Sequence, residues 1–187
     1  MSRLRAFIAI EASTEVRAAV GALVNELKGR VTTARWIPAQ NLHITVRFLG
    51  WTSEETLSEL TEELRDVLAK CKPFLLEFRG IGLFPTARRA RVISALVSQP
   101  PPELDLLHRQ VEAAVYRHGF PAERRPFRPH LTFARLRSST AALPRIQAEL
   151  DQRSLGRAAV DVAIVFESAL KQTGAVYHPR ARLALGG

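Results

Sequence analysis

The chain has 187 residues, of which 47% are hydrophobic and 24% are charged, so it can bury a core as one globular domain. Its net charge of +9 favours a phosphate-bearing partner, although arginines that merely coat the surface explain the charge equally well. Cys71 is the single cysteine, which excludes an intrachain disulfide. The apolar run over residues 6–10 is too short for a signal peptide or a membrane span, so we expect a cytoplasmic protein with no membrane partner.

Hydrophobic periodicity predicts strands in alternation with helices along the chain. Ser13 is expected to cap the first helix, and Thr52 is expected to form a capping box with Glu55 at the start of the second. The expected strands cover residues 4–10, 34–38, 42–49, 73–78, 92–97, 129–135, 159–166 and 176–185, and the expected helices cover residues 13–28, 52–69, 103–118 and 139–152.

Several of these strands alternate polar with apolar residues, which is typical of antiparallel sheets that have one open face. The predicted fold class is therefore α+β, with antiparallel sheets flanked by helices. The order strand–helix–strand–helix–strand occurs near the N-terminus and again from about Val92, which indicates an internal duplication with two similar lobes. No flexible linker divides the chain, so we expect residues 1–187 to form a single two-lobed domain.

Two of the expected strands carry the same pattern of histidine, apolar residue, threonine and apolar residue. Positions i and i+2 of a strand share a face, so His43 is expected beside Thr45, and His130 beside Thr132. A single pattern of this kind is more often structural, but its repetition favours a functional interpretation. Two such pairs that face each other would make a symmetric site for an anion that undergoes proton transfer.

Strict alternation along each strand predicts that Phe48 and Arg135 point to the apolar faces of their strands, opposite the histidines. A guanidinium at the end of either strand can neutralise a phosphate, and Arg135 is the preferred candidate, with Arg47 second. Arg135 requires a bulge or the end of its strand to turn inward.

Two histidines on opposite sides of a phosphodiester can act as acid and base, because the unperturbed pKa of histidine, about 6.5, makes both protonation states available near neutral pH. Neighbouring threonine hydroxyls can donate hydrogen bonds to the phosphate oxygens. Other chemistries find no support: the sequence lacks a His-Glu-x-x-His metal motif, a Gly-x-Ser-x-Gly elbow and a glycine-rich phosphate loop. We expect neither a metal nor a cofactor.

The residues around the two repeats resemble the two signatures of the 2H phosphoesterase superfamily. Within that superfamily the chain is most similar to the bacterial and archaeal RNA 2′,3′-cyclic phosphodiesterases, historically named 2′-5′ RNA ligases. The segments that carry the resemblance are residues 36–38, 41–50, 84–85, 91–93, 125–135, 168–170 and 174–177.

This resemblance implies a bilobal fold with pseudo-twofold symmetry and a positively charged central cleft. It also implies metal-independent opening of a 2′,3′-cyclic phosphate at an RNA end, for example on tRNA fragments, to leave a 2′-phosphate. By motif position His43 would be the proton donor to the leaving 3′ oxygen and His130 the proton acceptor that activates water, while Thr45, Thr132 and Arg135 would bind the substrate. We expect a monomer.

Three alternatives remain open at the level of sequence. One is RNA 2′-5′ ligation, which is the reverse reaction with a 5′-hydroxyl in place of water. Another is a non-catalytic module that binds RNA ends or nucleotides, and the third is a phosphodiesterase for small cyclic phosphates. Arg88 and Arg89, in a loop marked by glycine and proline, are expected to contact the backbone of longer RNA, and the roles of Tyr177 and His178 are left open.

Overall fold

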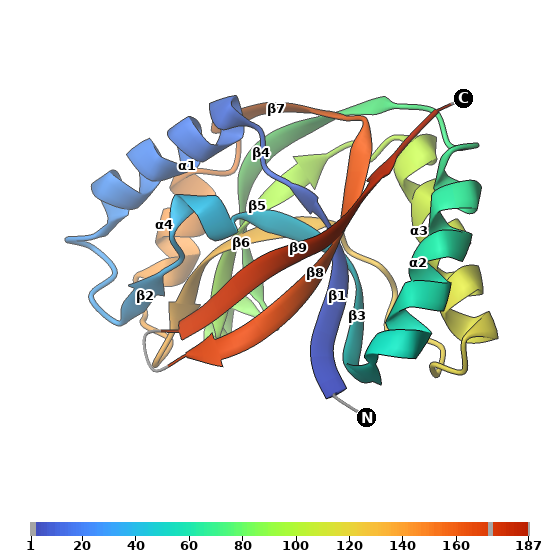
Figure 1. Cartoon of the computed structure of the whole chain (residues 1–187). Coiled ribbons are helices and arrows are strands. Elements are labelled where there is room, and N and C mark those ends of the chain that lie inside the picture. Colours follow the sequence, from blue (N-terminus) through green and yellow to red (C-terminus); the bar gives the residue numbers. More distant parts are fainter. Residues whose placement is uncertain (1–2, 172–173, 187) are drawn as a thin grey trace.

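The computed structural model describes residues 3–171 and 174–186, and all structural statements below refer to these residues (Figure 1). They form an α+β fold in which four α-helices and two short 3₁₀ turns accompany nine strands. The helices are α1 (Thr14–Leu27), α2 (Glu54–Leu68), α3 (Pro102–Arg117) and α4 (Leu143–Glu149), and the turns are η1 (Ala39–Asn41) and η2 (Ala87–Arg89). The strands are β1 (Arg3–Glu11), β2 (Ala34–Trp36), β3 (His43–Ser53), β4 (Phe74–Phe84), β5 (Val92–Ser98), β6 (His130–Leu136), β7 (Ser154–Val160), β8 (Val162–Lys171) and β9 (Gly174–Ala184).

The strands pair in the order β7-β4-β5-β6-β3-β1-β8-β9, with β2 added beside β6, and every pair is antiparallel. This order has a centre between β6 and β3, on either side of which four strands follow. We call β3, β1, β8 and β9 the first lobe and β6, β5, β4 and β7 the second lobe. The two lobes are joined at the centre by the pair Ile44–Leu131, so the two expected sheets are the halves of one curled sheet. The predicted fold class is confirmed.

The lobes are not the two halves of the sequence, because the last two strands return to the first lobe. The prediction of one strand over residues 159–166 is wrong for this reason. Strand β7 ends at Val160 in the second lobe and β8 begins at Val162 in the first, with exposed Asp161 between them. Neither glycine nor proline marks the point where the chain passes from one lobe to the other, so the sequence pattern predicts a single strand across it.

The caps of the first two helices differ in how well the sequence predicts them. Ser13 caps α1 as expected, since its hydroxyl accepts a hydrogen bond from the backbone N–H of Val16 at 3.1 Å. Helix α2 is capped by Ser53, whose hydroxyl accepts from the N–H of Thr56 at 3.1 Å. The predicted cap, Thr52, is a buried residue of β3, because that strand continues past Gly50.

The helices cover one face of the sheet and leave the other open (Figure 1). Helices α1 and α4 pack on β7 and β4, while α2 and α3 pack on each other and on β9 and β3. The main core fills the space between helices and sheet, and only a small second cluster of Phe7, Ala9, Ile164 and Phe166 lies apart from it. Within the described residues, no helix combines the length and apolar character needed to cross a bilayer.

Candidate active site

His43 and His130 are the first residues of β3 and β6, the two strands that meet at the centre of the sheet. The residue after each histidine, Ile44 in one lobe and Leu131 in the other, forms the pair that joins the lobes, and both are buried. Both histidines and the threonines two residues after them are half-buried. The structure therefore brings both predicted pairs together at the seam between the lobes.

Each histidine ring is held by the backbone two residues before it. Nδ1 of His43 lies 2.8 Å from the carbonyl oxygen of Asn41, and Nδ1 of His130 lies 2.6 Å from that of Arg128. A carbonyl oxygen only accepts hydrogen bonds, so Nδ1 carries the proton in both rings. Nε2 is left in both cases as the atom that gains or loses a proton during chemistry.

The two threonines differ in the hydrogen bonds that their hydroxyls make. The hydroxyls of Thr132 and Ser94 hydrogen-bond at 3.0 Å, and Ser94 is fully buried. In the register of the first lobe Ala9 lies opposite Thr45, as Ser94 lies opposite Thr132 in the second. Thr45 accordingly makes no side-chain hydrogen bond to another described residue. Ser94 could not be recognised as a site residue from the sequence, because it is embedded in a strongly apolar strand.

A β-bulge in β6 determines where Arg135 points. The β5–β6 register passes from Ile93–Ala134 to Ser94–Thr132, so Phe133 is an extra residue. Phe133 and Ala134 are both buried as a result, and the following residue, Arg135, is exposed on the face that carries His130. This is the bulge that the candidate role of Arg135 required.

A matching bulge in β3 has a different outcome. The β1–β3 register skips Val46, so Val46 and Arg47 both face the core side, and Phe48 turns to the face of His43. The expectation that Phe48 lies on the apolar face is therefore wrong, since its side chain is 61% exposed.

Arg47 is turned away from the site by the same bulge. Its guanidinium is buried, lies 3.2 Å from the carboxylate of Glu112 on α3, and donates a hydrogen bond to the carbonyl oxygen of Pro121. The contact with Glu112 is an ion pair whose atoms are not aligned as a hydrogen bond. Arg47 is thus not available to a phosphate on the open face.

Aromatic rings surround His43 much more completely than His130. The ring centres of Phe7, Tyr177 and Phe166 lie 5.0, 5.3 and 6.4 Å from that of His43. His130 packs on Phe84 alone among the described rings, at 4.8 Å. No pattern in the sequence connects these aromatic residues with His43, because they come from β1, β8 and β9.

Burial among these rings is the largest cause that lowers the pKa of His43 below its usual value. The positive charges of Arg135 and His130 lower the pKa of His43 further, while its hydrogen bond to Asn41 and the charge of Glu11 partly oppose the effect. His43 therefore carries its proton less readily than an exposed histidine does.

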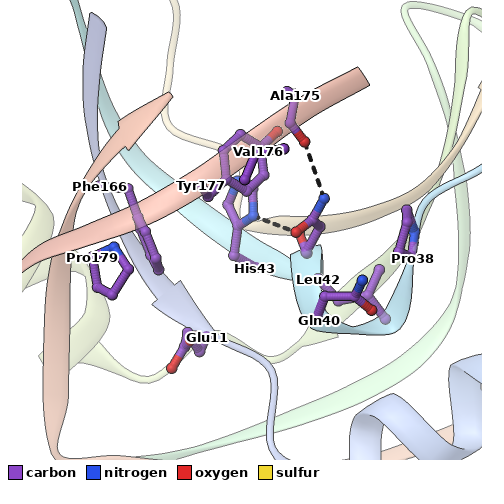
Figure 2. Close-up of a pocket in the computed structure, with 11 residues that line it drawn as sticks. Glu11, Pro38, Gln40, Leu42, His43, Phe166, Ala175, Val176, Tyr177 and Pro179 are labelled. Carbon is purple, nitrogen blue, oxygen red and sulfur yellow. Dashed lines mark hydrogen bonds between the residues drawn. The ribbon is translucent and has the colours of Figure 1, made fainter. Parts of the chain in front are cut away.

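A pocket of about 460 Å³ lies beside His43 (Figure 2). Its walls come from the segment before β3 and from β9, which are joined by a hydrogen bond of 3.3 Å from the Asn41 amide to the carbonyl oxygen of Ala175. Tyr177 and Phe166 form its apolar side, and Glu11 lies at its lower end in the view shown. The site is thus asymmetric, with its pocket on the His43 side.

Other residues singled out in the sequence lie outside this arrangement. Arg88 and Arg89 are exposed in η2 at the end of β4 in the second lobe, and His178 is exposed on β9, while its neighbour Tyr177 contacts His43. Among the described residues, no three His, Cys, Asp or Glu side chains gather as they would around a metal ion.

Comparison with known proteins places this arrangement in a family. An RNA 2′,3′-cyclic phosphodiesterase of Methanothermobacter thermautotrophicus is 29% identical over 94% of this chain and 95% of its own. A protein of the same name from Aeropyrum pernix is 32% identical over 74% of this chain and 78% of its own. The crystal structure of E. coli LigT in its apo form superposes with a TM-score of 0.83 at 25% identity and covers all of both chains. LigT structures also exist in complex with 3′-AMP and with ATP.

The sequence model of the 2′-5′ RNA ligase superfamily matches residues 12–168, a range that includes both His-Thr strands. The two histidines at the seam are what the sequence motifs of 2H phosphoesterases imply. The chain therefore belongs to the 2′-5′ RNA ligase superfamily, a group of 2H phosphoesterases.

Proposed function

We propose that the protein hydrolyses 2′,3′-cyclic phosphate ends of RNA to 2′-phosphomonoesters, with His43 as acid and His130 as base. The observation that carries the proposal is the matched pair of imidazoles at the seam, each fixed through Nδ1 and each without a hydrogen bond at Nε2 to another described residue. The names of the relatives support the substrate class, since they are RNA 2′,3′-cyclic phosphodiesterases. Fragments of tRNA that end in a cyclic phosphate are candidate substrates.

The reaction has a donor or acceptor for each proton. Nε2 of neutral His130 takes a proton from water as the water oxygen attacks phosphorus, and Nε2 of protonated His43 gives a proton to the 3′ oxygen as the P–O3′ bond breaks. The hydroxyls of Thr45 and Thr132 donate to the non-bridging oxygens, where negative charge builds. Arg135 neutralises part of that charge from the same face. The reaction as written uses no metal ion.

The pocket supports the assignment of the acid. In a 2′,3′-cyclic phosphate the leaving 3′ oxygen belongs to the ribose of the terminal nucleotide, so that nucleoside lies on the side of the acid. The pocket beside His43 offers space for it, with the rings of Tyr177 and Phe166 on its apolar side. Water then approaches from the His130 side.

The lowered pKa of His43 is compatible with this role once the substrate is bound. In the free protein, burial and the nearby cations disfavour the protonated imidazole. A phosphate anion that enters between the histidines favours the protonated form, because an adjacent opposite charge raises the pKa of a histidine. We expect substrate binding itself to load the acid with its proton.

The test is turnover of an RNA oligomer with a 2′,3′-cyclic phosphate end in the presence of EDTA, with the product resolved as 2′- or 3′-phosphate. His43→Ala and His130→Ala should each lower kcat by about 10²–10⁴-fold, the usual contribution of a general acid or base. His118→Ala is the control, because His118 lies at the end of α3 and pairs with Glu63 at 2.9 Å.

Each alternative function predicts a different result in the same assay. Binding of the oligomer without turnover by the unmodified protein would favour an RNA-end binding module. Joining of a second RNA with a free 5′-hydroxyl would favour ligation, and turnover that EDTA abolishes would contradict the metal-free reaction. Activity that survives both histidine substitutions would place the active site elsewhere.

A further inference from the structure

Two large aromatic side chains on β3 are exposed although they lie within a strand. Phe48 is 61% exposed and Trp51 is 60% exposed. Both follow the His-Thr pair of the first lobe along the same strand, towards its far end. The active site as described uses neither of them.

Both rings lie on the open face of the sheet, as His43 does. The ring of Phe48 is 5.9 Å from that of Phe7, which in turn contacts His43. Trp51 lies opposite Arg5 in the β1–β3 register, and residues opposite each other in an antiparallel pair share a face. Arg5 precedes Phe7 by two residues on β1 and so shares its face as well.

The cations at this end of the sheet are free to bind an anion. Arg5 is exposed and makes no hydrogen bond or ion pair with a described residue, unlike most arginines of the chain. Arg3 is also exposed and donates a hydrogen bond of 3.2 Å to the carbonyl oxygen of Trp51, which holds it beside that ring. Arg135 does not belong to this group, because it lies opposite Arg35 of β2, on the other side of the Ile44–Leu131 pair.

We propose that Phe48, Trp51 and Arg5 form a track that binds the single-stranded RNA leading to the cyclic phosphate end, an inference that rests on the proposed function. Exposed aromatic rings offer stacking surfaces to any base, and free guanidinium groups pair with the phosphates between bases. Aromatic rings lie here beside cations, and no carboxylate of the described residues pairs with Arg5. This combination matches a nucleic acid strand better than a protein or lipid surface.

The far end of the track, at Trp51, lies well away from His43. Trp51 lies eight residues after His43, and two bulges shorten that path, so the two side chains are about 20 Å apart along the strand at a rise of about 3.3 Å per residue. A single nucleotide bound at His43 does not reach that far. The track therefore acts only on substrates of several nucleotides.

The experiment compares one variant on two substrates, an RNA oligomer with a 2′,3′-cyclic phosphate end and the 2′,3′-cyclic mononucleotide that matches its last base. Trp51→Ala should raise KM for the oligomer by about five- to a hundredfold, because one base–aromatic stack is lost. The KM for the mononucleotide should stay unchanged. Trp51→Phe should keep most of the oligomer affinity because it keeps a stacking ring. Arg5→Gln should reduce the salt dependence of oligomer binding by about 0.7 in log–log slope.

The matched control is Tyr116→Ala, which removes an aromatic side chain that is 67% exposed on α3, away from the track. Anisotropy of the labelled oligomer on the unmodified protein and on Trp51→Ala gives a second measurement that needs no turnover. If the unmodified protein hydrolyses neither substrate, the proposed function fails, and the anisotropy still decides the track. Equal losses on both substrates, or oligomer binding unaffected by Trp51→Ala, would overturn the track.

Discussion

The two lobes present the same His-Thr pair in two different settings. Each has a histidine fixed by a carbonyl oxygen two residues earlier, a threonine two residues later, and a bulge after that threonine. In the first lobe three rings bury the histidine and the threonine has no hydrogen-bond partner among the described residues, whereas in the second one ring touches the histidine and Ser94 holds the threonine. The common backbone geometry orients both imidazoles in the same way, and their different surroundings are the basis on which we propose different roles for them.

The two lobes also differ in the residues that follow the bulge in each His-Thr strand. Counting from the threonines, Arg47 corresponds to Ala134 and Phe48 to Arg135. The second lobe thus offers a cation to the open face where the first offers a ring, and the first lobe buries its cation under α3. We infer that the second lobe serves the phosphate and the first lobe serves the nucleoside.

The largest difference between the lobes is the buried arginine of the first. Arg47→Met should lower the free energy of unfolding by about 2–4 kcal/mol, somewhat less than the loss of a fully buried partner, because Glu112 keeps 22% of its side-chain exposure. Ala134, its counterpart, has no such pair to lose. Urea denaturation measures the change.

A second variant tests whether the pair itself is responsible. Arg47→Met combined with Glu112→Leu should recover much of the lost stability, because the Glu112 carboxylate is then no longer left without its partner. Glu123, which lies 3.9 Å from Arg47, keeps its ion pair with Arg125 in both variants. Arg47 also donates a hydrogen bond to the carbonyl oxygen of Pro121, which lies in the segment between α3 and β6 that leads to His130. A double variant that is no more stable than the single one would mean that the loop contact, and not the ion pair, carries the stability.

The sequence was sufficient to predict the His-Thr strands, the α+β class and the two similar lobes, because all three follow from period-two patterns and their repetition. The sequence was not sufficient to predict which way the side chains after each threonine point. A bulge is a property of two paired strands, so the exposure of Phe48 and the inward turn of Arg135 depend on residues of β1 and β5 that the local pattern does not contain.

The aromatic surroundings of His43 could not be predicted for a related reason. Phe7, Phe166 and Tyr177 are far apart in the sequence and meet only because β8 and β9 return to the first lobe. Ser94 looks like one more small residue of a buried strand until Thr132 is placed opposite it. The sequence therefore indicates which groups react, and the sheet topology determines how each is tuned.

The cation of the second lobe gives a test of the acid and base roles. Arg135→Gln should lower kcat/KM at neutral pH by roughly tenfold or more, because a hydrogen bond between charged groups is worth about 1.5–3 kcal/mol. It should also raise the pKa of His43, since the charge of Arg135 is one cause of its lowered value. The matched control is Arg137→Gln, because Arg137 lies two residues after Arg135 and is also exposed.

The direction of the pH shift identifies the role of His43. The pH dependence of kcat/KM reports the ionisation of the free protein, and a general acid must gain its proton before the P–O3′ bond breaks, whether before or upon binding. The free-protein pKa of the acid therefore sets the alkaline limb of kcat/KM, and a raised pKa moves that limb to higher pH. A base must be neutral, so the same change in pKa would move the acidic limb to higher pH instead. Movement of the acidic limb would therefore exchange the roles of His43 and His130, and no movement would contradict the coupling between Arg135 and His43.

The smallest expected effect concerns the support of the threonines. Ser94→Ala should lower kcat by roughly fivefold, which is the loss of about 1 kcal/mol, because the Thr132 hydroxyl loses the hydrogen bond that orients it. Steady-state kinetics with the RNA oligomer measures the loss. Thr45 has no corresponding partner among the described residues, so the effect should be confined to the second lobe.

Double variants test whether the effect of Ser94→Ala is limited to the second lobe. Ser94→Ala should add little to Thr132→Val, because the hydroxyl it orients is already absent, and should add its full effect to Thr45→Val, which acts through the other lobe. Full additivity with both threonine variants would mean that Ser94 supports the buried packing of β5 and not the Thr132 hydroxyl. Non-additivity with Thr45→Val as well would mean that the two lobes respond as one unit across the Ile44–Leu131 pair, so that the asymmetry between them would no longer explain their separate roles.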